Sequence, residues 1–250
     1  MKGIVLAGGT GSRLYPLTRV TNKHLLPVGR YPMIYHPIMR LKRAGCTELA
    51  IVTSPEHMGD VVNLLGSGVR LGVDLTYRVQ DQPGGIAQAI DLCRNFTGSD
   101  RFAVMLGDNI LSSDFESDMK GFVHEERASA SRAHVLLKKV HDPERYGVPR
   151  FEGDAIVEVI EKPSDPPSSF SVVGIYFFDP GVYEVIRTLA PSDRGELEIS
   201  DVISHYARKR ELTHGVISGW WGDAGTLDGW HEANELAVDL VYDELKNETA

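Results

Sequence analysis

The residues best suited to chemistry begin with a glycine-rich loop near the N-terminus, Gly8-Gly9-Thr10-Gly11-Ser12-Arg13. Glycines let backbone N–H groups approach phosphate oxygens, and Arg13 adds a bidentate donor for such an anion. The loop lacks the GxxxxGK[ST] spacing of a P-loop, and Leu14 stands where a dinucleotide-binding GxGxxG fingerprint needs its last glycine. The acidic residue that follows such a fingerprint by about 20 positions is also missing. The loop therefore predicts a phosphate site of another kind or a structural turn.

The charges of the chain are unevenly distributed. The net charge is -9, yet the first 47 residues contain no Asp or Glu and hold eight basic residues: Lys2, Arg13, Arg19, Lys23, Arg30, Arg40, Lys42 and Arg43. A basic segment on an acidic protein indicates a local anion site. The overall acidity argues against a nucleic-acid partner. For Arg40, Lys42 and Arg43 the helical context favours a solvated helix face instead.

Gln80 is a candidate for recognising a nucleotide base. It follows a strand predicted at 75–79 and precedes Pro83-Gly84-Gly85. A side-chain amide both donates and accepts, which suits the edge of a pyrimidine, and Gly85 would leave room for the base. A hydrogen-bonded turn is the alternative for Gln80. The sequence offers no Ser or Cys nucleophile with a partnered base, which favours direct displacement over a covalent intermediate.

The elements that would position these residues alternate between strand and helix in the first half of the chain. Strands are predicted at 2–7, 48–53, 75–79 and 102–106, and helices up to Ala44, at 59–65 and at 86–93. This alternation predicts parallel pairing in a doubly wound α/β sheet. Ligands of such sheets bind beyond the carboxyl ends of the strands. The glycine-rich loop, Gln80 and Asp108 each follow a predicted strand, so we expect them to line one crevice.

The pattern changes from about residue 133. Longer strands separated by turns are predicted at 135–140, 156–160 and 172–178, which indicates a more antiparallel portion. Helices are predicted at 182–189 and 199–208, a strand at 213–217 and a C-terminal helix over 227–245. No apolar run approaches the roughly 20 residues that span a bilayer. Cys46 and Cys93 have no CxxC spacing, so neither a disulfide scaffold nor a zinc site is expected, and a reducing cytoplasm fits.

Ten segments in chain order resemble the signature of the sugar nucleotidylyltransferase family and span almost the whole chain. They are LAGGTGSRLYPLT, NKHLLPV, PMIYHPI, RVQDQPGGIAQAI, LGDNI, ERYGV, IEKP, VVGIYFFD, RGELEISD and WWGDAGT. The chain is most similar to the short form of the glucose-1-phosphate thymidylyltransferases. Gly222 and Ala224 differ from the Leu and Thr of many relatives, but Asp223 between them is retained.

The resemblance implies a Rossmann-like, doubly wound, mostly parallel mixed sheet with a smaller antiparallel sugar-binding portion, the fold of the nucleotide-diphospho-sugar transferases. It implies one domain over residues 1–250. Within it, about 1–130 would bind the nucleotide, about 131–230 would bind the sugar phosphate, and 227–245 would form the C-terminal helix.

The resemblance also assigns residues to the nucleotide side. Arg13 and Lys23 would act in catalysis together with Lys162, because positive groups must screen the repulsion between two phosphates and stabilise the departing pyrophosphate. The implied nucleotide-binding residues are Leu6, Ala7, Gly8, Gly9, Gly11, Ser12, Arg13, Gln80 and Gly85. Asp108 and Asp223 would be the ligands of Mg²⁺, which one or two carboxylates commonly hold together with phosphates and waters.

On the sugar-phosphate side the resemblance implies eight residues: Asn109, Tyr146, Gly147, Glu161, Lys162, Val173, Gly174 and Arg194. Glu161 would accept hydrogen bonds from sugar hydroxyls, and Lys162 and Arg194 would hold the sugar phosphate. Exposed ion pairing is the alternative for Glu161 and Lys162. For Arg194 the alternative is pairing with the acidic helix start that follows it.

The implied activity is the Mg²⁺-dependent transfer of a thymidylyl group from dTTP to α-D-glucose 1-phosphate by direct displacement. A UTP-using enzyme is an alternative, because uracil lacks only the 5-methyl group. A non-catalytic nucleotide-sugar-binding regulatory subunit is another, although such a protein should lose Arg13, Lys23 or one aspartate, and all four are present. A nicotinamide dehydrogenase is disfavoured by Leu14. The expected partners are these small molecules, with no nucleic acid or membrane, and a homo-oligomer is left open.

Overall fold

The computed structural model describes residues 1–124, 131–243 and 245, and it divides into two compact units. The first unit comprises Met1–Gln82, Met105–Phe115 and Gly219–Ala250. The second comprises Pro83–Val104 and Glu116–Ser218. The chain therefore passes from the first unit to the second and back twice, whereas the functional parts expected from the sequence follow one another along the chain.

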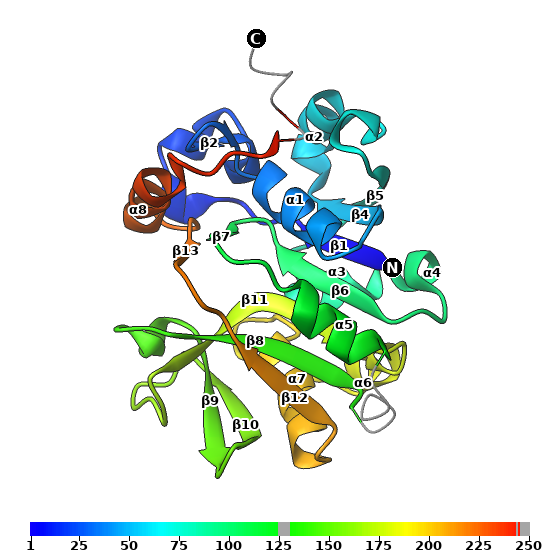
Figure 1. Cartoon of the computed structure of the whole chain (residues 1–250), viewed down its shortest axis with the longest axis vertical. Helices are drawn as coiled ribbons and strands as arrows, with labels where there is room; N and C mark the ends of the chain where they lie inside the picture. Colours follow the sequence, from blue (N-terminus) through cyan, green and yellow to red (C-terminus); the bar gives the residue numbers. More distant parts are fainter. Residues whose placement is uncertain (125–130, 244, 246–250) are drawn as a thin grey trace. The chain divides into compact units, whose positions relative to one another are not determined.

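The first unit is built on parallel strands. β1 (Lys2–Leu6), β4 (Glu48–Thr53) and β5 (Asp74–Val79) lie side by side in that order, with Leu6 opposite Val52. After its first residue, each of β1 and β4 is buried throughout. Such continuous apolar runs are typical of parallel strands that are covered on both faces. Helix α1 (Tyr35–Arg43) contacts β1, as Figure 1 shows.

A short antiparallel pair joins distant parts of the chain within the first unit. β7 (Asn109–Leu111) pairs with β13 (Trp221–Asp223), and Asp223 lies opposite Asn109. β7 follows directly on β6 (Phe102–Leu106), the strand at which the chain returns to the first unit. The pairing thus carries Asp223 to the end of the strand that precedes Asp108.

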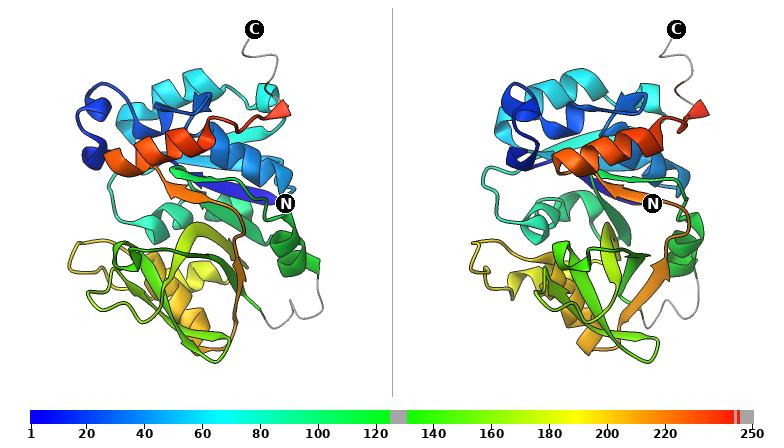
Figure 2. Two further views of the ribbon diagram at one scale, coloured as in Figure 1. Left: turned by 60° about the vertical axis from the view of Figure 1, so that its left-hand side comes forward. Right: turned by 90° about the vertical axis from the view of Figure 1, so that its left-hand side faces the viewer.

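The C-terminal helix of the first unit packs on the segment that follows Lys23. That segment is the hairpin of β2 (Pro27–Val28) and β3 (Tyr31–Pro32). Helix α8 (Leu227–Ala237) contacts β2 and β13, and in both views of Figure 2 it lies beside the blue N-terminal segment. Trp230 Nε1 donates to Pro27 O over 2.9 Å, which fixes the helix to the hairpin.

In the second unit three strands lie side by side in the order β12-β8-β11. β8 (Ala133–Lys139) pairs antiparallel with β11 (Phe170–Phe178) and parallel with β12 (Leu212–Val216). β9 (Gly147–Glu152) and β10 (Ala155–Glu161) form a separate antiparallel hairpin.

The helices of the two units complete the architecture. Helix α7 (Ile199–Arg208) contacts β10, and its Ser204 hydroxyl bonds the backbone of Val159. The remaining α-helices are α2 (Met58–Leu65) in the first unit and α3 (Ile86–Asp91), α4 (Arg94–Thr97), α5 (Glu116–His124) and α6 (Val182–Arg187) in the second. None of the helices in the described ranges is both long and apolar enough to cross a bilayer.

The expected fold class, a mixed α/β architecture with a central, mostly parallel sheet, is confirmed. The C-terminal helix is shorter than the predicted 227–245, since α8 ends at Ala237. Tyr242 and Leu245 are nonetheless buried, and the Tyr242 hydroxyl lies 2.9 Å from His36 Nδ1. The apolar residues Tyr242 and Leu245 are thus buried outside α8 rather than on a face of that helix.

The interpretation of Arg40 as part of a solvated helix face is wrong. Arg40 is 2% exposed, and its guanidinium donates to Asp114 Oδ1 over 2.5 Å and to Ser112 O over 3.2 Å. Its partners lie more than 70 positions away, so the local helical pattern could not reveal them. A buried arginine needs such partners because an uncompensated buried charge is costly.

Candidate active site

The glycine-rich loop leaves β1 and turns sharply at Gly11. Gly11 has φ 63°, and a Cβ there would lie 2.9 Å from Thr18 Cγ2. The Thr18 hydroxyl donates to Gly11 O over 2.8 Å and holds the turn. Arg13 follows in the 3₁₀ turn Ser12–Leu14, in which Ser12 and Arg13 are exposed and Leu14 is buried. The loop therefore presents backbone and Arg13 to solvent, as a phosphate site requires.

Gln80 lies beside this loop. It follows β5, and its side-chain Oε1 would be 3.1 Å from a Cβ built on Gly8. The absence of a side chain at Gly8 thus allows the close approach of Gln80. Gly8 and Gln80, which were both predicted to bind the nucleotide, thus lie next to each other in the first unit.

Lys23 is held by the two residues that flank it. Buried Asn22 caps the 3₁₀ turn Lys23–Leu25: its Oδ1 accepts from His24 N over 2.8 Å, and its Nδ2 donates to Ala7 O over 3.3 Å. The His24 ring also bonds Asn22 Oδ1, with Nδ1 2.7 Å away. Burial, aided by the charge of Lys23, lowers the pKa of His24 to about 3, so its ring is neutral at physiological pH.

Lys23 forms an almost buried ion pair with Asp108. Lys23 Nζ lies 2.5 Å from Asp108 Oδ2, and the side chains are 12% and 9% exposed. Burial is the largest single influence and would raise the pKa of Asp108, but the ammonium of Lys23, its hydrogen bond and the other nearby positive groups, Arg13 among them, together hold that pKa well below its usual range. Asp108 is therefore a carboxylate at neutral pH.

Asp223 approaches the same point from β13. Gly225 N donates to Asp223 Oδ1 over 3.0 Å, and Ala224 N donates to Asp108 O over 2.9 Å. Burial and the nearby charge of Asp108 both raise the pKa of Asp223. The two aspartates, 115 positions apart in the sequence, thus interact electrostatically across a short gap.

Gly225 shows how closely the charged groups converge. A Cβ built on Gly225 would lie 2.9 Å from both Asp108 Oδ2 and Asp223 Oδ1, and 3.2 Å from Arg13 Nη2. Sequence reasoning did not single out Gly225, although it lies two positions after Asp223. It also did not single out Asn22 and His24, whose only signal was their position beside Lys23.

The donor set suits a hard divalent cation. Asp108 and Asp223 offer carboxylate oxygens, and the described residues contain no group of three or more His, Cys, Asp or Glu that could hold a metal. Mg²⁺ is commonly bound by one or two carboxylates, with substrate phosphates and waters filling its other positions. These residues therefore fit Mg²⁺ bound together with phosphate.

Both the oxygen and the nitrogen of the Asn109 side-chain amide form hydrogen bonds. Trp221 Nε1 donates to Asn109 Oδ1 over 2.7 Å, and Asn109 Nδ2 donates to Asp108 Oδ1 over 3.3 Å. Of the eight residues expected on the sugar-phosphate side, Asn109 alone belongs to the first unit. Its bonds connect Trp221 to a carboxylate of the site.

The remaining sugar-phosphate candidates lie in the second unit. Gly147 pairs with Glu161 across the β9–β10 hairpin, and Lys162 N donates to Tyr146 O over 2.9 Å. Lys162 has φ 44°, a left-handed conformation that is uncommon for a non-glycine residue and worth attention at a functional position. Its Nζ lies 3.6 Å from Glu161 Oε1.

Arg194 lies near the same glutamate, with Nη2 3.8 Å from Glu161 Oε1. Burial is the main reason why the pKa of Glu161 is raised; Lys162 and Arg194 oppose the shift. Val173 and Gly174 are buried on β11. The second unit thus gathers Glu161, Lys162 and Arg194 into one charged cluster.

Gly85 belongs to the second unit, unlike the other residues predicted to bind the nucleotide. It has φ 93°, and a Cβ there would lie 2.6 Å from Leu197 O. Leu197 N donates to Gly84 O over 2.9 Å, so the backbone around Gly85 is tied to the segment that follows Arg194.

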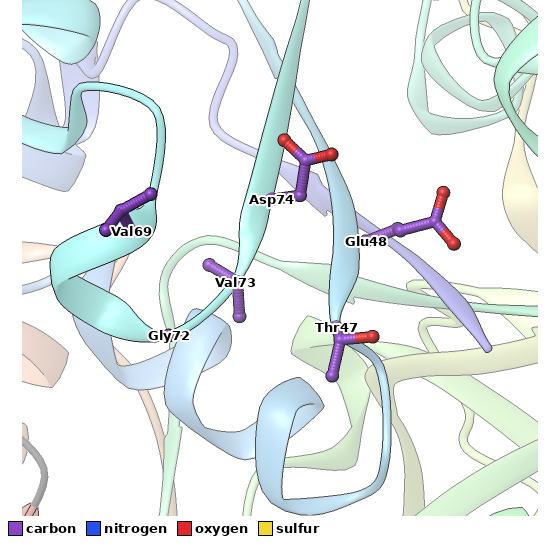
Figure 3. A pocket seen from close by; sticks show the side chains of 6 residues that line it. All are labelled: Thr47, Glu48, Val69, Gly72, Val73 and Asp74. Atoms are coloured by element: carbon purple, nitrogen blue, oxygen red, sulfur yellow. The ribbon is translucent and has the colours of Figure 1, made fainter.

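An open pocket of the first unit lies away from these residues. Figure 3 shows its six lining residues: Thr47, Glu48, Val69, Gly72, Val73 and Asp74. It lies where β4 and β5 begin, whereas Gln80 follows the carboxyl end of β5. No residue of the predicted sites lines this pocket.

The chain is similar to known nucleotidyl transferases along nearly its full length. The family model described as "Nucleotidyl transferase" matches residues 2–239. A glucose-1-phosphate thymidylyltransferase of Neisseria meningitidis is 41% identical over 93% of this chain and 81% of its own length. The low-salt glycan biosynthesis nucleotidyltransferase Agl11 of Haloferax volcanii is 36% identical over 96% of this chain, which spans 66% of that relative.

The fold has a similar solved structure as well. A chain from Bacillus anthracis, described as a glucose-1-phosphate thymidylyltransferase and crystallised in complex with a sucrose, superposes with a TM-score of 0.91. It is 54% identical in sequence, and the match covers 97% of each chain. The resemblance expected from the ten sequence segments is thereby confirmed. The chain therefore belongs to the nucleotidyl transferase family of enzymes.

Proposed function

We propose that this chain is a glucose-1-phosphate thymidylyltransferase, which transfers a thymidylyl group from dTTP to α-D-glucose 1-phosphate and releases pyrophosphate. One observation carries the proposal: Arg13, Asp108 and Asp223 converge around Gly225, with Lys23 paired to Asp108. Two cationic and two carboxylate side chains are what a reaction between two phosphate groups needs. The choice of dTTP and glucose 1-phosphate as substrates rests on the names of the similar proteins.

The reaction is a direct displacement. An oxygen of the sugar phosphate attacks the α-phosphorus of dTTP, the new P–O bond forms, and the bond to the β-phosphate breaks. Arg13 and the amides of the glycine-rich loop bind the triphosphate, and Lys23 stabilises the charge that develops during the transfer. Gln80 and Gly85 hold the thymine.

Asp108 and Asp223 hold Mg²⁺ in this proposal. Enzymes of this family generally use a divalent metal ion. Such an ion supplies charge neutralisation and polarises the phosphoryl oxygens. Neighbouring residues hold the two carboxylates in place. Lys23 donates to Asp108 Oδ2, and Gly225 N donates to Asp223 Oδ1. The other oxygen of Asp108, Oδ1, accepts from Asn109, which Trp221 holds in turn.

The second unit supplies the acceptor side. Glu161 accepts hydrogen bonds from sugar hydroxyls, and Lys162 and Arg194 bind the sugar phosphate. The other residues proposed for the acceptor are Tyr146, Gly147, Val173 and Gly174 of this unit, and Asn109 of the first unit. Glu161 suits this role because it is largely buried, carries two cationic neighbours, and lies at the end of a strand.

We further propose that the enzyme works in the cytoplasm, where both substrates would be available.

The metal proposal is tested by Asp108→Asn and Asp223→Asn in a pyrophosphate-release assay. Each change removes a charge that faces Mg²⁺, so we expect turnover to fall at least about 100-fold while the fold is kept. EDTA should stop the wild type. Asp60→Asn, at a carboxylate 58% exposed on α2, is the matched control and should leave turnover unchanged. Near-normal turnover in either folded site variant would remove the two-carboxylate proposal.

The base site is tested by Gln80→Glu. A carboxylate cannot donate at neutral pH, so a pyrimidine edge that needs a donor would meet repulsion. We expect use of dTTP and of UTP to fall together, by about tenfold or more, the scale of losing a hydrogen bond to a buried polar group. Exposed Gln82→Glu is the matched control. Unchanged pyrimidine kinetics in Gln80→Glu would mean that Gln80 is only a turn residue.

A further inference from the structure

Arg194 is clamped by a glutamate that none of the functional assignments includes. Arg194 Nη2 donates to Glu198 Oε1 over 2.9 Å and to Glu198 Oε2 over 2.8 Å, and Nε donates to Oε1 over 3.2 Å. Three hydrogen bonds from one guanidinium to one carboxylate fix both the position and the plane of the group. The Glu198 side chain is 12% exposed, compared with 46% for Arg194.

Glu198 does not serve as a helix cap. It is the residue that precedes α7, but its side chain makes no capping hydrogen bond to the first turn. Glu198 Oε1 also accepts a hydrogen bond from the Ser192 hydroxyl over 2.7 Å. The Ser192 oxygen in turn accepts from Arg194 N over 3.3 Å. The carboxylate is thus directed at the loop that carries Arg194.

The backbone of this loop is also fixed. Ser192 N donates to Glu196 O, Gly195 N donates to Ser192 O, and Leu197 N donates to Gly84 O. The backbone that leads into Glu198 is therefore held in place by hydrogen bonds. A long arginine side chain that is already restrained loses less conformational entropy when it binds a phosphate.

Two further carboxylates compete for the same guanidinium. Arg194 Nη2 lies 3.6 Å from Glu196 Oε2 and 3.8 Å from Glu161 Oε1, both longer than its contact with Glu198. Without the charge of Glu198, the guanidinium would be free to close on Glu161. That contact would occupy the Glu161 oxygen that is proposed to accept hydrogen bonds from the sugar hydroxyls. Both Arg194 and Glu161 would then bind the sugar phosphate less well.

We propose that Glu198 is a positioning residue for the sugar 1-phosphate: it orients Arg194 towards the phosphate and holds it away from Glu161. This inference rests on the proposed function, in which Arg194 and Glu161 bind the acceptor substrate. Glu198 itself does not touch the substrate. Glu198 acts through Arg194, so its loss should weaken the binding of the sugar 1-phosphate and leave the binding of dTTP unchanged.

The test begins with Glu198→Gln in the full-length protein. We expect KM for glucose 1-phosphate to rise about tenfold, the scale of one lost charge-assisted hydrogen bond, with KM for dTTP changed less than about twofold. Glu198→Asp keeps the charge and should restore most of the affinity for glucose 1-phosphate. Glu158→Gln breaks a comparable pair, with Arg150 and Arg208 at 2.8 and 3.2 Å, and is the matched control. It should change neither KM.

A double-mutant cycle with Arg194→Gln then shows whether the effect passes through Arg194. In that background Glu198→Gln should raise KM for glucose 1-phosphate less than about twofold further, because coupled residues are not additive. Three results would each overturn the inference: full additivity in the cycle, equal loss for dTTP and glucose 1-phosphate, or no change in Glu198→Gln.

The proposed function and this inference can fail separately. Calorimetric titration of the wild type and Glu198→Gln with glucose 1-phosphate measures binding without turnover. If the wild type binds glucose 1-phosphate but forms no product, the proposed function fails, and a weaker affinity in Glu198→Gln still supports the inference. A wild-type protein that neither turns over nor binds glucose 1-phosphate would overturn both.

Discussion

Gly225→Ala should disable the site without unfolding the protein. The added Cβ would lie 2.9 Å from Asp108 Oδ2 and from Asp223 Oδ1, and 3.2 Å from Arg13 Nη2. Ordinary carbon–oxygen contacts are several tenths of an ångström longer, so at least one carboxylate must move. Gly225 has no left-handed φ, so the alanine strains no backbone there.

The size of the effect follows from these distances. Inserting one methyl group into a packed site typically costs about 1–3 kcal/mol of stability. A misplacement of about 1 Å at a reacting centre can cost about 100-fold in rate. We therefore expect kcat to fall by roughly 30- to 100-fold and the Mg²⁺ concentration for half-maximal rate to rise, with Tm lowered by only a few degrees.

Gly222→Ala is the matched control for Gly225→Ala. It adds the same methyl group on β13, but its Cβ would meet only Ala233, at 3.5 Å from Cβ and 3.9 Å from Cα. Both variants would be assayed by pyrophosphate release across a Mg²⁺ titration, with Tm measured by calorimetry. Wild-type kcat and Mg²⁺ dependence in Gly225→Ala, or equal losses in the two variants, would refute the reasoning.

Two further predictions concern hydrogen bonds of the first unit. Trp221→Phe removes the donor to Asn109, whose amide restrains Asp108, so kcat should fall about tenfold; an unchanged kcat would show that this chain of bonds does not restrain the site. His36 is neutral when folded because burial lowers its pKa to about 4. Unfolding restores a pKa near 6.5, so His36 by itself should lower the free energy of unfolding by about 3 kcal/mol as the pH falls from 6.5 to 4. Chemical denaturation of His36→Gln should show a shallower loss over that range, and an identical pH profile would contradict the assignment.

The sequence predicted the parts of the site that depend on local patterns. Strand β1 and the strand that precedes Asp108 are apolar runs buried on both faces, so their ends could be located. The glycine-rich loop was visible because its glycines are needed for a positive φ at Gly11. These signals were enough to predict the fold class and to locate the glycine-rich loop and its turn.

Other features depend on pairings between distant segments. The β7–β13 pairing sets Asp223 opposite Asn109, and no local pattern around either residue encodes it. The clamp of Glu198 on Arg194 is close in sequence, yet its geometry depends on a loop tied to Gly84. Arg40 was misread for the same reason, because its partner Asp114 comes from another segment.

The most direct test of the proposed function is a substrate matrix. The purified protein would be incubated with Mg²⁺, each of dTTP, UTP, ATP and GTP, and several sugar 1-phosphates, and pyrophosphate would be measured together with the nucleotide sugar by mass spectrometry. We expect the highest turnover with dTTP and glucose 1-phosphate, with dTDP-glucose and pyrophosphate formed in equal amounts. A clear preference for UTP would contradict the thymidylyl donor, and no pyrophosphate from any pair would contradict the proposed function itself.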